Sequence, residues 1–75
     1  MDEKVEREIA SLIALQKKKL MNFANQLLPH ITEEDILQPN DFPILENHPY
    51  FRHEEGVLEG LQTALAAVRA IQRQS

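Results

Sequence analysis

The chain has no cysteine, only two glycines and only two serines among its 75 residues. Without cysteine it can form neither a disulfide framework nor a thiolate metal cluster. The glycines, Gly56 and Gly60, are too few for a glycine-rich phosphate-binding loop. The serines, Ser11 and Ser75, have no histidine near them in the sequence, so no nucleophilic pair is indicated. We therefore expect a protein that is not an enzyme and that uses no cofactor.

Long hydrophobic runs and an excess of basic residues are also missing. The net charge is −4, which argues against a dedicated nucleic-acid binder because phosphate contacts require a basic surface. Residues 1–8 include four acids and no long apolar run follows, so we expect neither a signal peptide nor a transmembrane helix. The three lysines at 17–19 spread over about 200° of a helix and predict a solvated surface. A cytoplasmic protein that binds neither nucleic acid nor membranes is expected.

Two segments show the hydrophobic periodicity of long helices. The first covers residues 2–28 and ends before Pro29, because the residue before a proline avoids the α region. The second covers residues 49–73, with Pro49 suited to its first turn. Each segment begins with acids and carries basic residues toward its end, which favours an antiparallel pair. The sequence predicts one all-α domain, an antiparallel helical hairpin that assembles into a multi-helix bundle.

The connector, residues 29–48, combines a helix start with crowded hydrophobic side chains. Thr32 and Asp35 have the spacing of a capping box, which predicts a short helix that ends by Pro39. Several hydrophobic residues lie in the connector and the start of the second helix: Leu37, Phe42, Ile44, Leu45, Tyr50 and Phe51. They predict either a hydrophobic plug over the open end of the hairpin or a docking surface that presents Phe42, Tyr50 and Phe51.

A strip of small residues follows one side of the second helix: Gly56, Gly60, Ala64 and Ala67. Glycine inside a helix costs roughly 1 kcal/mol relative to alanine. Two glycines four residues apart therefore indicate that another backbone approaches closely along this strip. Alternatively, they reflect a frayed or bent first turn. The strip predicts an interface, and Gly60→Leu is expected to destabilise the protein or its association.

The apolar arcs of both helices are wider than a two-helix hairpin can bury. On the second helix the arc covers roughly 200°, whereas a helix that faces one core shows a stripe of a little over 100°. We therefore expect that the protein is not a monomer. Gln16 lies in the middle of the first apolar arc. It is expected either to fix the register of the helices or to reach past its neighbours to solvent.

His48, His53 and Glu54 are the candidate metal ligands, and His30 stands at the other end of the connector. Their spacing does not form a known helical zinc motif. The favoured interpretation is therefore a helix start with solvated polar residues. Our leading hypothesis is a small cytoplasmic protein that acts by associating with protein, either itself or another helical protein, as a homo-oligomer, adaptor or co-chaperone-like subunit. The alternative is a metal- or small-ligand-binding bundle that uses the three histidines and neighbouring acids.

Overall fold

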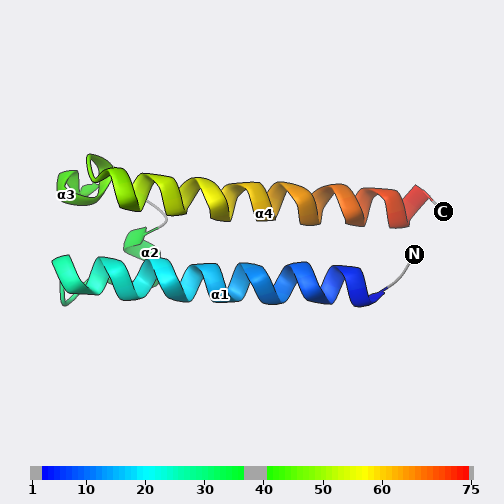
Figure 1. Cartoon of the computed structure of the whole chain (residues 1–75), viewed down its shortest axis with the longest axis horizontal. Coiled ribbons are helices and arrows are strands. Elements are labelled where there is room, and N and C mark those ends of the chain that lie inside the picture. Colours follow the sequence, from blue (N-terminus) through cyan, green and yellow to red (C-terminus); the bar gives the residue numbers. More distant parts are fainter. Residues whose placement is uncertain (1–2, 37–40, 75) are drawn as a thin grey trace.

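The protein folds as an antiparallel helical hairpin. The computed structural model describes residues 3–36 and 41–74. It contains four helices there, α1 (Glu3–Leu27), α2 (Glu33–Ile36), α3 (Pro43–Glu46) and α4 (Pro49–Gln74). The long helices α1 and α4 lie side by side and run in opposite directions, so that α1 begins where α4 ends (Figure 1). The predicted all-α hairpin is confirmed.

The predicted boundaries of the long helices agree with the structure to within one residue. α1 ends at Leu27 and α4 continues to Gln74. The predicted start of the first helix at Asp2 lies outside the described residues. The hairpin is elongated, with extents of 44 × 19 × 17 Å.

The seam between α1 and α4 repeats with spacings of three and four residues, as in a coiled coil. On α1 it follows Ile9, Ile13, Gln16, Leu20, Phe23 and Leu27, and on α4 Phe51, Glu54, Leu58, Leu61, Leu65 and Val68. Leu20 and Phe51 are among the side chains with almost no exposed surface. This seam is narrow, since it takes only two positions from each seven-residue repeat.

The connector folds over the end of the hairpin and closes its core. Leu45 of α3 is fully buried, and Ile31, just before α2, is almost as inaccessible. Phe42 and Ile36 are partly buried and pack against the same core. These contacts favour the plug over the docking surface for this part of the connector. Leu37 lies outside the described residues.

The predicted capping box at the start of α2 is confirmed. The backbone N–H of Thr32 donates to the Asp35 carboxylate at 3.0 Å, and the backbone N–H of Asp35 donates to the Thr32 hydroxyl at 3.3 Å. The two bonds satisfy two amides that the first helical turn leaves without partners. The short side chain of Asp35 is therefore long enough for this role.

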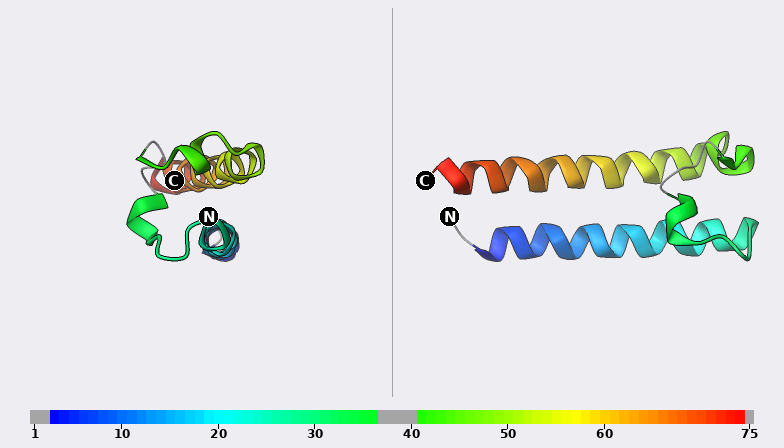
Figure 2. Two further views of the ribbon diagram at one scale, coloured as in Figure 1. Left: turned by 90° about the vertical axis from the view of Figure 1, so that its left-hand side faces the viewer. Right: turned by 180° about the vertical axis from the view of Figure 1, so that it is seen from behind.

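α2 stands to one side of the α1–α4 pair (Figure 2). Ile36 of α2 shares a shallow pocket with Leu20 and Met21 of α1 and with Leu58 of α4. On this side, α2 covers the boundary between the long helices. The opposite side of the pair carries the candidate site.

Candidate interaction surface

The side of the hairpin away from α2 exposes hydrophobic side chains from both long helices. The rings of Phe23 on α1 and Tyr50 on α4 meet here, with centroids 4.7 Å apart. Val5 and Leu12 lie on the same side of α1 as Phe23, and Val57 and Ala64 follow the side of α4 that carries Tyr50. We call Val5, Leu12, Val57, Leu61, Ala64 and Val68 the open face.

The larger side chains of the open face remain substantially accessible. Val5 is 43% exposed, Leu12 42% and Val57 39%. Leu61 and Val68 are half-buried, because they also border the seam. Both helices therefore expose hydrophobic side chains on this side of the hairpin, which a further helix could cover, and the charged Glu8 and Lys19 lie on the same side of α1.

The predicted strip of Gly56, Gly60, Ala64 and Ala67 lies on the exposed surface of α4. A Cβ atom added at either glycine would meet nothing within 4 Å. Gly60 is about 100° round the helix from Leu61, which faces the seam, so α1 does not approach it. The close approach predicted for this strip is thus not made inside the hairpin, and an approach by another chain stays a prediction.

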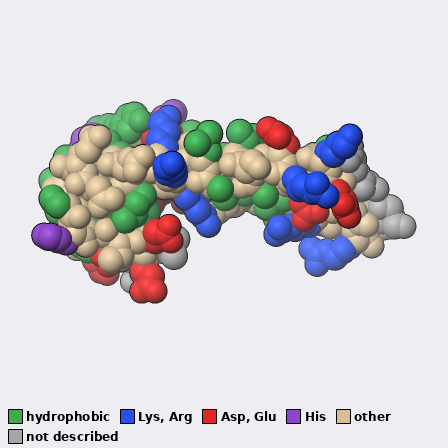
Figure 3. Space-filling model, turned by 90° about the horizontal axis from the view of Figure 1, so that it is seen from below, with side chains coloured by type: hydrophobic (Ala, Val, Ile, Leu, Met, Phe, Trp, Pro, Cys, Tyr) green, Lys and Arg blue, Asp and Glu red, His purple; other side chains and the backbone are tan. Residues whose placement is uncertain are grey.

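The outer surface of α4 carries very little charge along this strip. Residues 56–68 contain one charged side chain, Glu59, although 27% of the whole chain is charged. Figure 3 looks onto α1 instead, where hydrophobic side chains lie along the middle of the hairpin, between lysine or arginine side chains and a mixed charged group near the chain termini. Because residues 56–68 of α4 carry only one charged side chain, this stretch is weakly hydrated, which lowers the free-energy cost of removing it from water.

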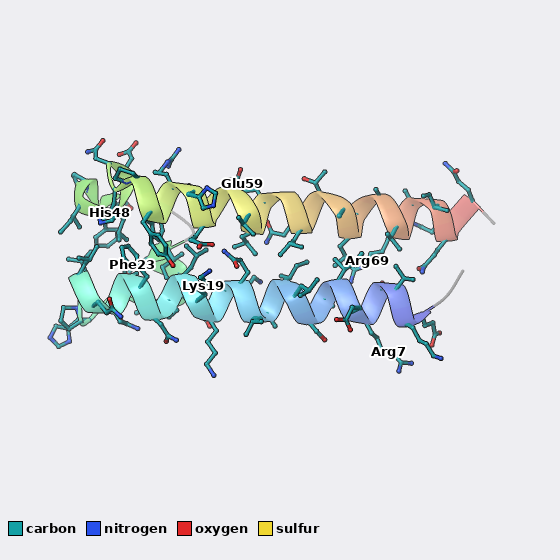
Figure 4. All side chains as sticks on the ribbon, viewed as in Figure 1. Arg7, Lys19, Phe23, His48, Glu59 and Arg69 are labelled. Carbon is teal, nitrogen blue, oxygen red and sulfur yellow. The ribbon has the colours of Figure 1, made fainter. Side chains whose placement is uncertain are left out.

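A buried polar network crosses the seam near the connector. The Gln16 side-chain amide donates to the Glu54 backbone carbonyl at 2.8 Å and to its carboxylate at 2.7 Å. Lys19, labelled in Figure 4, reaches the other carboxylate oxygen at 2.9 Å. Gln16 and Glu54 are both buried. Of the two expectations for Gln16, the structure supports the one in which it fixes the register.

Hydrogen bonds and charge shift the titration of this network. The hydrogen bond from Lys19, and then the one from Gln16, lower the pKa of Glu54 below its ordinary value. The hydrogen bond to Glu54 and its negative charge raise the pKa of Lys19. The pair therefore stays ionised over a wider pH range than either group alone. From the sequence, Glu54 was expected at a solvated helix start, and this contact was not predicted. The position of Glu54 in the seven-residue repeat is the signal that indicates the contact.

An ion pair joins the other end of the hairpin. The Arg69 guanidinium lies 2.7 Å from the Glu6 carboxylate (Figure 4), and the Arg69 side chain is about half exposed. Together with Lys19 and Glu54, this pair places the acidic start of each long helix beside the basic part of the other. The charge complementarity predicted for an antiparallel hairpin is present at both ends.

The predicted aromatic interface residues do not lie together on the surface. Phe51 is fully buried in the core, so no partner can contact it in this conformation. Phe42 is half-buried against the core, while Tyr50 is exposed and packs on Phe23. Only Tyr50 of the three borders the open face.

The metal-ligand candidates are not gathered into a site. Among the described residues, no group of three or more histidine, aspartate or glutamate side chains could hold an ion. His48 packs its ring against Phe23, with centroids 4.9 Å apart. His53 is exposed, and Glu54 is held by Gln16 and Lys19. His30 lines a separate depression with Ile31, of about 230 Å³, which is smaller than the roughly 300–1,000 Å³ of typical small-molecule sites.

In comparisons with protein-family models, curated proteins and solved structures, nothing matches this chain. Within residues 3–36 and 41–74, no helix combines the length and the apolar character needed to cross a membrane.

Proposed function

We propose that this protein works by protein–protein association and binds a helical partner through the open face, as a homo-oligomer, an adaptor or a subunit of a larger assembly. The observation that carries the proposal is the exposure of Val5, Leu12 and Val57 along one side of the hairpin. The proposal includes no catalytic step. It places the protein in the cytoplasm, in keeping with the absence of cysteine.

The total accessible surface supports this role. The chain exposes 5424 Å². A folded monomer of 8.7 kDa is expected to expose about 4,700 Å². The difference of roughly 700 Å² is close to the approximately 800 Å² that one partner contributes to a standard interface. An interface of ordinary size would thus bring the hairpin to the accessible surface expected for its mass.

The proposal is tested by placing a charge on the open face and an equal charge elsewhere on α4. Val57→Glu introduces a carboxylate into the open face, whereas Ala66→Glu introduces one on a different side of the same helix. Both variants and the wild type would be used to capture proteins from the native cell. Each captured protein would then be purified and its binding measured directly. Circular dichroism would check that both variants remain helical.

We expect a protein that binds the wild type and Ala66→Glu but loses binding to Val57→Glu, because a partner would have to desolvate the new charge. A second copy of this chain would also satisfy this expectation. If every captured protein binds Val57→Glu as well as it binds the wild type, the open face is not the binding surface and the proposal fails.

A further inference from the structure

The seam between α1 and α4 is closed more fully on the side of α2 than on the side of the open face. In the seven-residue repeat, lettered a to g, the side chains at a and d form the seam. The a positions from Ile13 to Leu20 and from Phe51 to Leu65 are buried. The apolar d positions are only half-buried: Ile9, Phe23, Leu61 and Val68. Because d lies toward the open face, the hairpin leaves part of its own core uncovered there.

The g positions lie next to d and continue this partly covered core outward. They are Val5, Leu12 and Lys19 on α1, and Tyr50, Val57 and Ala64 on α4. Except for Lys19 and Ala64, these side chains are each between 39% and 43% exposed. In a two-stranded coiled coil the e and g positions are often charged. On α4 the e positions are indeed polar, Glu55, Gln62 and Arg69, whereas the g positions are not. This asymmetry indicates a further member of the bundle on the g side.

The spacing of the g positions matches that of a helix. Lys19 contacts Glu54 and Phe23 contacts Tyr50, and these contacts place Leu12 about midway in height between Val57 and Ala64. Side chains from α1 and α4 therefore alternate about every 5 Å along the face. The a and d side chains of a coiled-coil helix have the same average spacing of about 5 Å. Side chains on one face of an extended strand are about 7 Å apart, which does not match.

A single helix fits this surface better than a second hairpin. On each long helix, d and g together face about 50° round from the direction of the seam. Three mutually packed helices meet their neighbours about 60° apart, whereas a square of four helices requires about 90°. A second folded copy also has no seam to offer, because its own a positions already face each other.

The charges on this side specify what the helix carries. The Lys19 side chain is 51% exposed, while its partner Glu54 is 10% exposed and also accepts a hydrogen bond from Gln16. This network is neutral overall, and Glu54 takes one of the three N–H donors of the Lys19 ammonium. A covering carboxylate would add an uncompensated charge, which is costly away from water, whereas an uncharged acceptor would satisfy the donors. Glu8 is exposed at the edge of the same side and suits a basic side chain.

We infer that the open face receives one amphipathic helix of another protein, which lies along α1 and α4 and completes a three-helix bundle. This inference rests on the proposed function and names the chemistry of the partner. The helix carries apolar side chains at alternating spacings of three and four residues. It places an uncharged hydrogen-bond acceptor, such as an asparagine or glutamine amide, beside Lys19 and a lysine or arginine beside Glu8.

A synthetic helical peptide tests this inference with the full chain. The probe has about three heptads with leucine at a and d, glutamine at the central d position and lysine at its edges. It carries a fluorescent label, and its binding is measured by anisotropy. Leu12→Glu and Val57→Glu place a charge on each helix that borders the face. Ala14→Glu and Ala66→Glu are the matched controls, at exposed positions on other sides of α1 and α4.

We expect one peptide to bind per chain. Leu12→Glu and Val57→Glu should each raise the dissociation constant about tenfold or more, because the peptide would have to desolvate the new carboxylate. The two controls should leave the dissociation constant unchanged, and circular dichroism would check that all four variants remain helical. An absence of binding at high micromolar concentration overturns the inference. So does a loss of binding in only one of the two variants, since the helix would then not lie between α1 and α4.

A second pair of peptides tests the acceptor beside Lys19. In the second peptide of the pair, leucine replaces the central glutamine. The wild type should bind the glutamine peptide more tightly, because leucine leaves the covered ammonium donors without an acceptor. The double variant Lys19→Met, Glu54→Gln removes both charges together and should reverse this preference. The ratio of the two dissociation constants is unaffected by a general loss of stability, and an unchanged ratio contradicts the inferred chemistry.

Sedimentation equilibrium separates the inference from the proposed function. A dimer of the wild type that both Leu12→Glu and Val57→Glu dissociate would place a second copy on the open face. That result overturns the inference and leaves the proposed function standing. Both fail if neither the peptide nor any captured protein distinguishes Val57→Glu from the wild type.

Discussion

Leu45→Ala tests whether the connector closes the core of the hairpin. Leu45 has no exposed surface and lies in the same cluster as Leu20 and Phe51. Removing a fully buried leucine side chain costs about 2–5 kcal/mol, depending on how far the cavity collapses. A core of this size supplies only about 3–5 kcal/mol by itself. The substitution should therefore remove most of the stability of an isolated hairpin.

Ile44→Ala is the matched control, because Ile44 precedes Leu45 in α3 but is 48% exposed. Burying an isoleucine contributes about 1.5–3 kcal/mol. Half of that contact should be lost, so the control should cost roughly 1 kcal/mol. Urea unfolding followed by circular dichroism would give the free energy of unfolding of both variants. Sucrose would be added to all samples, because it stabilises the folded state and keeps Leu45→Ala folded before urea is added.

Equal costs for the two substitutions would refute this reasoning. They would mean that α3 does not pack on the core in solution. A large cost for Leu45→Ala with a small one for Ile44→Ala would instead exclude a connector that serves only to dock a partner.

Two further predictions concern the capping box and the seam network. Thr32→Ala should lower the free energy of unfolding by about 1 kcal/mol, since it removes the hydroxyl that accepts a hydrogen bond from the Asp35 backbone N–H. The control Thr63→Ala removes only a hydroxyl that donates to the Glu59 carbonyl within α4. It should have little effect in the same urea titration. Lys19 and Gln16 lower the pKa of Glu54 in the folded state, so its contribution to stability is fully present above its ordinary pKa of 4.5 and is lost as the pH falls through the lower folded value. Glu54→Gln should therefore flatten the acid limb of the stability–pH curve more than Glu59→Gln does, and identical curves for the two variants would contradict the network.

Periodicity and local helix signals were sufficient to predict the hairpin from its sequence. Pro29 and Pro49 mark the two inner boundaries because each acts on its own backbone and immediate neighbours. The Thr32–Asp35 box is likewise a local interaction, over three residues. The antiparallel direction followed from charges that lie in blocks, so it did not depend on pairing particular residues.

The contact between Gln16 and Glu54 could not be predicted in the same way. Each residue was assigned from its own helix, and Glu54 was interpreted as an acid at a solvated helix start. Their pairing depends on the register of α1 against α4, which the connector and the whole seam set together. A seven-residue repeat applied to both helices at once would have placed Glu54 between Phe51 and Leu58, inside the seam.

The two glycines of α4 show that a local sequence signal does not identify the element that packs against it. Their low helix propensity predicts an unusual position, but it contains no information on which helix would approach. The hairpin places α1 on the side of Leu58 and Leu65, and leaves Gly56 and Gly60 open. Each glycine costs about 1 kcal/mol in helix propensity, a large fraction of the roughly 3–5 kcal/mol that one small core provides. Among the described residues, nothing lies within 4 Å of a Cβ atom placed at either glycine, so no contact inside the hairpin offsets this cost.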